Sequence, residues 1–174
     1  MHILKKISLI LISLLLGSCT TEESLNELVK RAGAPLFEGM GNHTHPITTN
    51  NSYVQRYFDQ GLTIDFAFNH AESARSFRAA QNLDPNCAMC YWGEAFSLGS
   101  FLNAHMTTEK GVQGRKAILI AAELAEGNTS QMEQDLIQAT VVRYPENWTT
   151  EISRDKQARQ PTYRAFADAM AEVY

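Results

Sequence analysis

Three histidines and a pair of cysteines are the side chains of this sequence whose type and spacing could support chemistry. His43 and His45 lie two residues apart in a segment without hydrophobic periodicity, and His70 opens a predicted helix. Imidazole is a common ligand of copper and zinc, so these histidines are candidates for a metal site. No third ligand stands at a fixed spacing from the first two. We therefore expect His70 to form a hydrogen bond with a neighbouring helix or with the preceding loop instead.

Cys87 and Cys90 form a Cys-x-x-Cys pair at the start of another predicted helix, where the helix dipole lowers the pKa of a thiol and favours redox chemistry. No predicted strand precedes the pair, as a thioredoxin-like site requires, and Tyr91 stands where haem attachment requires a histidine. Two alternatives follow. The pair closes a local disulfide in an oxidising compartment, or it packs as two small hydrophobic side chains.

The rest of the sequence excludes several classes of function. It contains no hydrolase elbow, no phosphate-binding loop and no zinc-protease helix, so we predict no catalytic residue, no cofactor and no enzymatic activity. The chain carries 15 Lys and Arg against 19 Asp and Glu, a formal net charge of −4. Because no basic patch is available to neutralise phosphates, we do not expect a nucleic-acid partner.

The third cysteine, Cys19, closes a segment typical of exported proteins. Two lysines precede the apolar run 7–16, which is shorter than the ~20 apolar residues that span a bilayer. The sequence Leu16-Gly17-Ser18-Cys19 resembles the lipobox of bacterial lipoproteins. That resemblance implies a signal peptide over residues 1–18 and a lipid on Cys19. It also implies a location in the bacterial cell envelope, anchored in a membrane. Thr20 lacks the acidic character of an inner-membrane retention signal, so we prefer the outer membrane.

The elements that must position these side chains begin after residue 52. Residues 19–52 contain few large apolar residues, and we predict that they form a lipidated N-terminus and a flexible tether. A short helix from Ser24 to Arg31 is stopped by Gly33 and Pro35. Residues 53–174, at about the length of one domain, form the predicted folded body.

Every periodic segment of the folded body is helical, and no segment alternates as a strand would, so the predicted fold class is all-α. A loop rich in Gly, Ser, Asn and Thr is inserted at 99–108, and 147–160 is polar without helical periodicity. The expected helices run from about Tyr57 to Phe66, Ala71 to Ala80, Cys87 to Leu98, Thr108 to Glu126, Ser130 to Tyr144 and Tyr163 to Tyr174.

The spacing of aromatic and small residues matches the 34-residue period of helical-hairpin repeats. If Tyr57 takes the bulky position of a repeat, Gly61 takes the small position and Phe77 the position that fills the gap between neighbouring pairs. One period further, Tyr91 and Ala95 repeat the bulky and small residues. We therefore predict a solenoid of helix pairs similar to tetratricopeptide repeats.

Longer segments strengthen this prediction. They are His45-Pro46-Ile47-Thr48-Thr49, Gln55-Arg56-Tyr57-Phe58-Asp59-Gln60-Gly61-Leu62, Ala67-Phe68-Asn69-His70, Ala74-Arg75-Ser76-Phe77, Leu83-Asp84-Pro85-Asn86-Cys87-Ala88-Met89 and Tyr91-Trp92-Gly93. Together they resemble a family of bacterial exported tetratricopeptide-repeat lipoproteins of largely unassigned function. The resemblance implies a helical repeat domain and supplies no catalytic residue. Because the last predicted helix stops in mid-pattern at Tyr174, without a polar capping helix, we expect the chain to be truncated.

Such repeats bind peptides in a groove formed by the inner faces of their first helices. In this chain the resemblance places seven residues on that groove: Phe58, Leu62, Asp65, Phe66, Met89, Trp92 and Phe96. Alternatively, the same residues pack against the inserted loop, the N-terminal segment or later repeats. We expect a non-catalytic scaffold that binds a protein or peptide. The alternative is a metal- or redox-linked periplasmic protein that uses the histidines or the cysteine pair above.

Overall fold

A computed structural model describes residues 24–102 and 104–173, and within these ranges the protein consists of helices and connecting segments without a strand. The all-α prediction is therefore confirmed. The predicted signal peptide 1–18 and the lipid-bearing Cys19 lie outside the described residues. No helix in the described ranges is long and apolar enough to cross a membrane. The helices are α1 (Leu25–Ala32), α2 (Ser52–Phe66), α3 (His70–Leu83), α4 (Ala88–Leu98), α5 (Thr108–Ala125), α6 (Gln131–Val142), α7 (Thr150–Arg154) and α8 (Lys156–Ala171).

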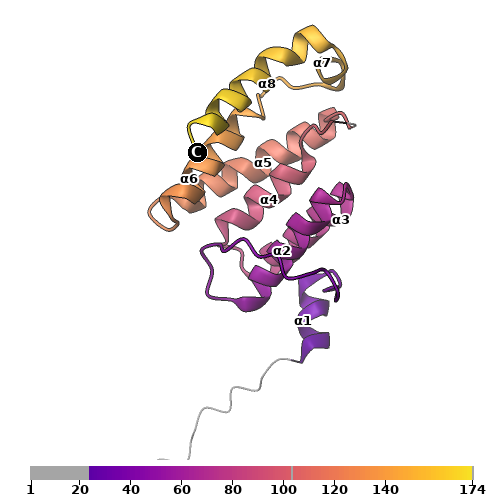
Figure 1. Cartoon of the computed structure of the whole chain (residues 1–174), viewed down its shortest axis with the longest axis vertical. Coiled ribbons are helices and arrows are strands. Elements are labelled where there is room, and N and C mark those ends of the chain that lie inside the picture. Colours follow the sequence, from indigo (N-terminus) through magenta and orange to yellow (C-terminus); the bar gives the residue numbers. More distant parts are fainter. Residues whose placement is uncertain (1–23, 103, 174) are drawn as a thin grey trace, which may run out of the picture.

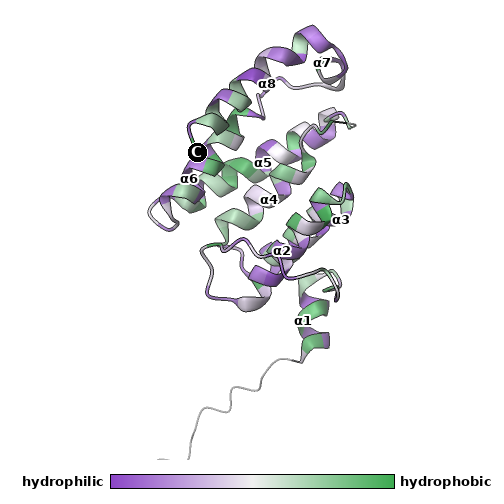
Figure 2. Cartoon of the chain, in the orientation of Figure 1, coloured by the Kyte–Doolittle hydropathy of each residue, from purple (hydrophilic) through white to green (hydrophobic). Residues whose placement is uncertain are grey.

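The helices pack in pairs that follow one another along the longest axis of the molecule (Figure 1). α2 packs on α3, α4 on α5, and α6 on α8, while α1 lies against α3. α5 presents hydrophobic residues in the middle of this stack, whereas α8 is largely hydrophilic (Figure 2). In accordance with that composition, α8 contributes no fully buried residue to the core.

Polar caps fix the starts of these helices. Asn51 accepts from the first amides of α2, which therefore begins at Ser52, before the predicted start at about Tyr57. Ser130 and Glu133 form a reciprocal capping box that starts α6 where the sequence predicts it. The prediction is wrong between 147 and 160, where α7 forms and α8 begins at Lys156. The cause is Asp155, whose carboxylate accepts from two backbone amides and so starts α8 before the hydrophobic periodicity begins.

Phe77 fills the space between the first two helix pairs. Its side chain is fully buried, and a Cβ atom added at Gly61 or at Gly93 would lie 2.7 Å or 2.3 Å from ring atoms of Phe77. Phe77 thus lies between α2 and α4, where Gly61 and Gly93 admit its ring. Ala95, the predicted small residue of the second repeat, is buried, and its carbonyl accepts a hydrogen bond from the Tyr144 hydroxyl. Close helix packing here depends on glycine from both sides.

Residues 34–51 form an ordered segment, hereafter the strap, that connects α1 to α2 and lies against α2. Ala34 and Ile47 of the strap are buried, and the Tyr57 hydroxyl donates to the carbonyl of Ala34 at 2.6 Å. Before the strap, α1 buries Leu28 and Ala32 against α3. The short helix predicted from Ser24 to Arg31 is present as α1, whereas the prediction of a flexible tether is wrong for residues 34–51. Polar side chains of α2 hold this segment, and such contacts leave no periodicity in the strap sequence.

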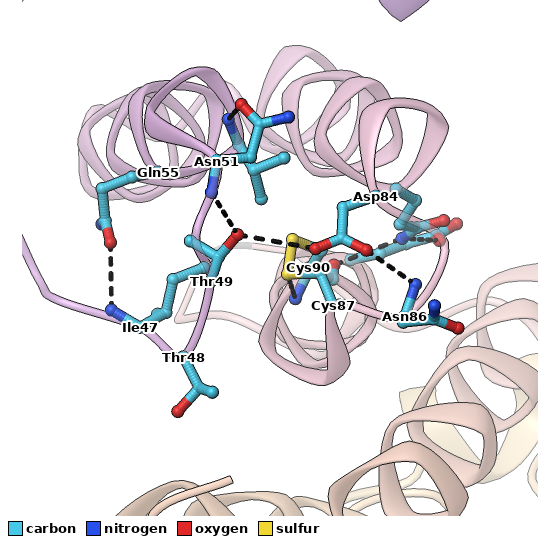
Figure 3. Close-up of a disulfide and its surroundings, with 12 residues drawn as sticks. Ile47, Thr48, Thr49, Asn51, Gln55, Asp84, Asn86, Cys87 and Cys90 are labelled. Atoms are coloured by element: carbon cyan, nitrogen blue, oxygen red, sulfur yellow. Dashed lines mark hydrogen bonds between the residues drawn. A yellow bond between two sulfur atoms is a disulfide. The ribbon is translucent and has the colours of Figure 1, made fainter. Parts of the chain in front are cut away.

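Cys87 and Cys90 are joined by a disulfide at the start of α4 (Figure 3). Cys87 is also the N-cap of α4, because its sulfur accepts from the backbone amide of Cys90 at 3.2 Å. Both residues are buried, at 1% and 0% exposure, so a redox partner cannot reach the sulfur atoms in this conformation. The disulfide thus closes the turn that Asp84 and Pro85 begin.

Candidate partner-binding surface

The predicted groove is not an open surface. Five of its seven residues are buried, namely Phe58, Leu62, Asp65, Met89 and Trp92. The strap covers the first of these, with the His45 ring 6.1 Å from the Phe58 ring. α6 covers another, because the Trp92 indole donates to the Thr140 hydroxyl at 2.8 Å. The groove prediction is therefore wrong for these five residues. The alternative, in which they pack against other segments of the same chain, is what the structure shows.

The three candidate metal ligands have separate environments. His43 lines an open cleft between the strap and α2, and the His45 amide donates to the Asp59 carboxylate at 2.9 Å. His70 Nδ1 lies 3.0 Å from the Asp65 carboxylate, an interaction with the helix before it. Among the described residues, no group of three or more His, Cys, Asp or Glu side chains is placed to hold a metal ion. His43, His45 and His70 are therefore not brought together into one site.

A second surface carries large apolar side chains that are exposed to solvent. Phe66 and Phe68 close α2, and they are 68% and 65% exposed, while Leu102 in the α4–α5 loop is fully exposed. The two connections lie along the same edge of the molecule (Figure 1). His70 joins them, because its ring stacks on Phe101 at 3.6 Å and lies 6.2 Å from the Phe68 ring. We call Phe66, Phe68, Phe101 and Leu102 the aromatic edge.

Phe68 has a backbone conformation that favours glycine. Its φ is 65°, in the left-handed region, and it is the only non-glycine residue with positive φ among the described residues. The amide of Phe68 donates to Asp65 and that of Asn69 to Ile64, the hydrogen-bond pattern with which helices commonly end at glycine. A non-glycine residue there costs about 1–2 kcal/mol. A large apolar side chain is thus exposed at a position where glycine would fold better, a combination found at functional sites.

Buried charged groups support the aromatic edge from below. Asp65 is 3% exposed and holds His70, whose Nε2 is buried without a hydrogen-bond partner. Arg143 is buried as well and donates to the carbonyls of Phe96 and Ser100. Burial lowers the pKa of the Arg143 guanidinium, and the nearby Asp65 charge opposes that shift. These bonds hold the start of the α4–α5 loop rigidly.

Aromatic rings surround the same guanidinium. The Cζ atom of Arg143 lies 5.7 Å from the ring centre of Phe96, 5.4 Å from that of Phe101 and 5.1 Å from that of Phe166. A Cβ atom at Gly99 would lie 2.2 Å from this guanidinium, so only glycine permits the approach. Phe101 is therefore fixed between two rigid partners, the His70 ring and the Arg143 guanidinium.

A hollow of about 530 Å³ opens beside the aromatic edge. It is lined by Ser100, Phe101, Leu102, His105, Arg159 and Tyr163. The Arg159 guanidinium lies over the Tyr163 ring at 5.9 Å. Sequence reasoning identified Phe66 but missed Phe68, Phe101 and Leu102. The available signal was the placement of large apolar residues in a turn and in a loop that are otherwise polar.

The aromatic edge presents apolar side chains beside a hollow that includes Arg159, and the charged groups beneath it, Asp65 and Arg143, are buried and hydrogen-bonded. Comparison with known proteins adds no assignment: no protein-family model, no curated protein and no solved structure matches this chain.

Proposed function

We propose that this chain is a lipid-anchored protein of the bacterial cell envelope whose tetratricopeptide-like helical domain binds a partner protein and catalyses no reaction. The observation that carries the proposal is the exposed Phe68, held in a left-handed conformation and linked through the His70 ring to Phe101, the neighbour of the exposed Leu102. The disulfide between Cys87 and Cys90 supports an oxidising location. The packing of Phe77 between Gly61 and Gly93 supports the repeat assignment.

The chemistry of the aromatic edge favours a protein as the occupant. Aromatic, Arg and Leu-sized side chains around a hollow are typical of interface centres, where one partner side chain fills a pocket. The hollow accommodates an apolar side chain against Phe101 and Leu102, and Arg159 can bind a carboxylate at its rim. Because the supporting network is already ordered, little conformational entropy is lost on binding.

Replacing Phe68 by glycine should separate stability from binding. We expect the free energy of unfolding to rise by about 0.5–1 kcal/mol, because relief of left-handed strain exceeds the entropy cost of glycine. We expect binding to be lost with the exposed ring. Chemical unfolding measures the first effect. For the second, a photo-crosslinking amino acid in place of Leu102 should give one discrete product in living cells, and F68G should abolish it.

Val112 provides the matched control, since it is 66% exposed on α5 outside the aromatic edge. A crosslinker there should not give the same product, and Val112→Ser should leave the product of the Leu102 position unchanged. The proposal fails if both positions give the same products or if F68G leaves the crosslink intact. In the same cells, Cys19→Ser should move the protein out of the membrane fraction, which tests the lipid anchor separately.

A further inference from the structure

The strap is bound to α2 through its backbone at two places, near Phe37 and at residues 45–47, and residues 38–44 form a loop between them. Its backbone amides donate to side chains on one face of the helix: Phe37 to Gln60 at 2.7 Å, His45 to Asp59 at 2.9 Å and Ile47 to Gln55 at 3.0 Å. The side-chain amides of the two glutamines donate in return to the carbonyls of Pro35 and His45. Main-chain hydrogen bonds of this kind recognise an extended conformation without reading sequence.

α6 completes this set of contacts from the other side. The amide of Thr48 donates to the Glu133 carboxylate at 2.7 Å, and the Thr48 hydroxyl donates to its second oxygen. Burial raises the pKa of Glu133, but the hydrogen bonds from Thr48 and Ser130 outweigh burial and lower it below the ordinary value. The carboxylate is therefore charged at neutral pH, and its hold on Thr48 is lost only as pH falls through the lowered pKa.

Apolar packing holds the strap much less firmly than these polar bonds do. Only Ala34 and Ile47 of the strap are buried apolar residues, and Phe37 is 40% exposed. An open cleft of about 440 Å³ is lined by residues 36–44 of the strap and by Arg56, Gln60 and Thr63 of α2, and at one end the Thr44 hydroxyl donates to the Asp59 carboxylate at 2.8 Å. Gly39 and Gly41 have positive φ and nothing within 4 Å of an added Cβ. Such a segment opens at lower free energy than the core beneath it.

We infer that the inner face of α2 and α6 is a binding site for an extended peptide, and that the strap occupies it as a displaceable ligand of the same chain. The residues that hold the peptide backbone are Gln55, Asp59, Gln60 and Glu133 (Figure 3 shows the Ile47 end). A competing peptide needs free amides at these spacings and one apolar side chain in place of Ile47. Opening uncovers Phe58, where the His45 ring now lies. The site is separate from the aromatic edge, so each can fail independently.

Glu133→Gln is the variant of choice, because glutamine preserves the capping box of α6 while the charge that holds Thr48 is lost. In hydrogen exchange, we expect the amides of Phe37, His45, Ile47 and Thr48 to exchange about tenfold faster, the factor that corresponds to about 1.4 kcal/mol. The core amides of α3 should not change. Gln131→Ala is the control, since Gln131 lies on the same turn of α6 and contacts Asp135 instead of the strap.

A synthetic peptide with the sequence of residues 34–49 tests the binding site directly. A fluorescent form of it should bind Thr48→Ala about tenfold more tightly than it binds the wild-type chain, because this variant weakens the strap while the Glu133 carboxylate stays available to the peptide. Glu133→Gln, which removes the same contact from the strap and from the peptide, should show no such gain. N-methylation of the peptide at the residue equivalent to Ile47 removes the N–H group that donates to the Gln55 side chain, and it should abolish binding. The inference is overturned if strap and α3 amides exchange together in Glu133→Gln, or if the peptide binds Thr48→Ala no more tightly than it binds the wild-type chain.

Discussion

Alanine at position 93 should destabilise the protein by about 3 kcal/mol, because its Cβ would lie 2.3 Å from two ring carbons of Phe77. Phe77 has little room to move away, since its ring also lies so close to Gly61 of the opposite helix that a Cβ added there would be 2.7 Å from it. The strain would appear as a lower midpoint in denaturant with an unchanged slope, because the mutation changes stability and not the surface exposed on unfolding.

Phe77→Leu in the same chain should rescue part of this loss. The smaller side chain frees space for the new Cβ, so the double variant should be at least 1 kcal/mol more stable than the sum of the two single effects. Gly111→Ala is a matched control in α5, where the added Cβ would lie 3.0 Å from one carbon of Trp148 and should cost less than half as much. If Gly93→Ala costs no more than this control, Phe77 does not determine the spacing of the helix pairs.

Gly61 and Gly93 also show how much of the helix packing can be predicted from sequence periodicity. The spacing of Tyr57, Gly61 and Phe77 identified the first pair correctly, because α2 and α3 follow one another through a short turn. The period of 34 did not identify Gly93, which admits the Phe77 ring from the next helix pair. α4 has 11 residues against 15 in α2, and α5 has 18 against 14 in α3. Counting by a fixed period cannot follow such changes in helix length.

The tether and groove predictions failed for a related reason. The face that carries Phe58 and Trp92 was identified, but not its cover, because the strap is held by polar bonds that leave no local pattern. One of them joins Thr48 to Glu133, 85 residues away. The aromatic edge left only a weak signal, the large apolar residues in otherwise polar connections. The exposure of Phe68 follows from its φ of 65°, and nothing in the residue type indicates that conformation.

Replacing Arg143 by methionine should cost about 3 kcal/mol of unfolding free energy and loosen the aromatic edge. Methionine fills much of the volume, but the carbonyls of Phe96 and Ser100 lose a charged donor. The ring of Phe101 also loses the guanidinium that lies 5.4 Å from its centre. We expect faster hydrogen exchange at Phe101 and Ala104, whose amides donate to each other's carbonyls.

Arg143→Lys distinguishes the charge from the geometry of this site. Lysine retains the positive charge near Asp65 but cannot donate in a fixed plane to two carbonyls while stacking on three rings, so it should lose nearly as much stability as methionine. Arg115→Lys is the control, because Arg115 is partly exposed and donates to one carbonyl, that of Tyr144, and the change should cost under about 1 kcal/mol.

Both Arg143 variants should lose the crosslink from the Leu102 position while being destabilised, whereas F68G should lose it while being stabilised. Opposite changes in stability with the same loss of binding are expected only if binding requires both the exposed Phe68 ring and the contacts around Arg143. A crosslink that survives in Arg143→Met would show that the partner does not need the contacts between Arg143, Ser100 and Phe101.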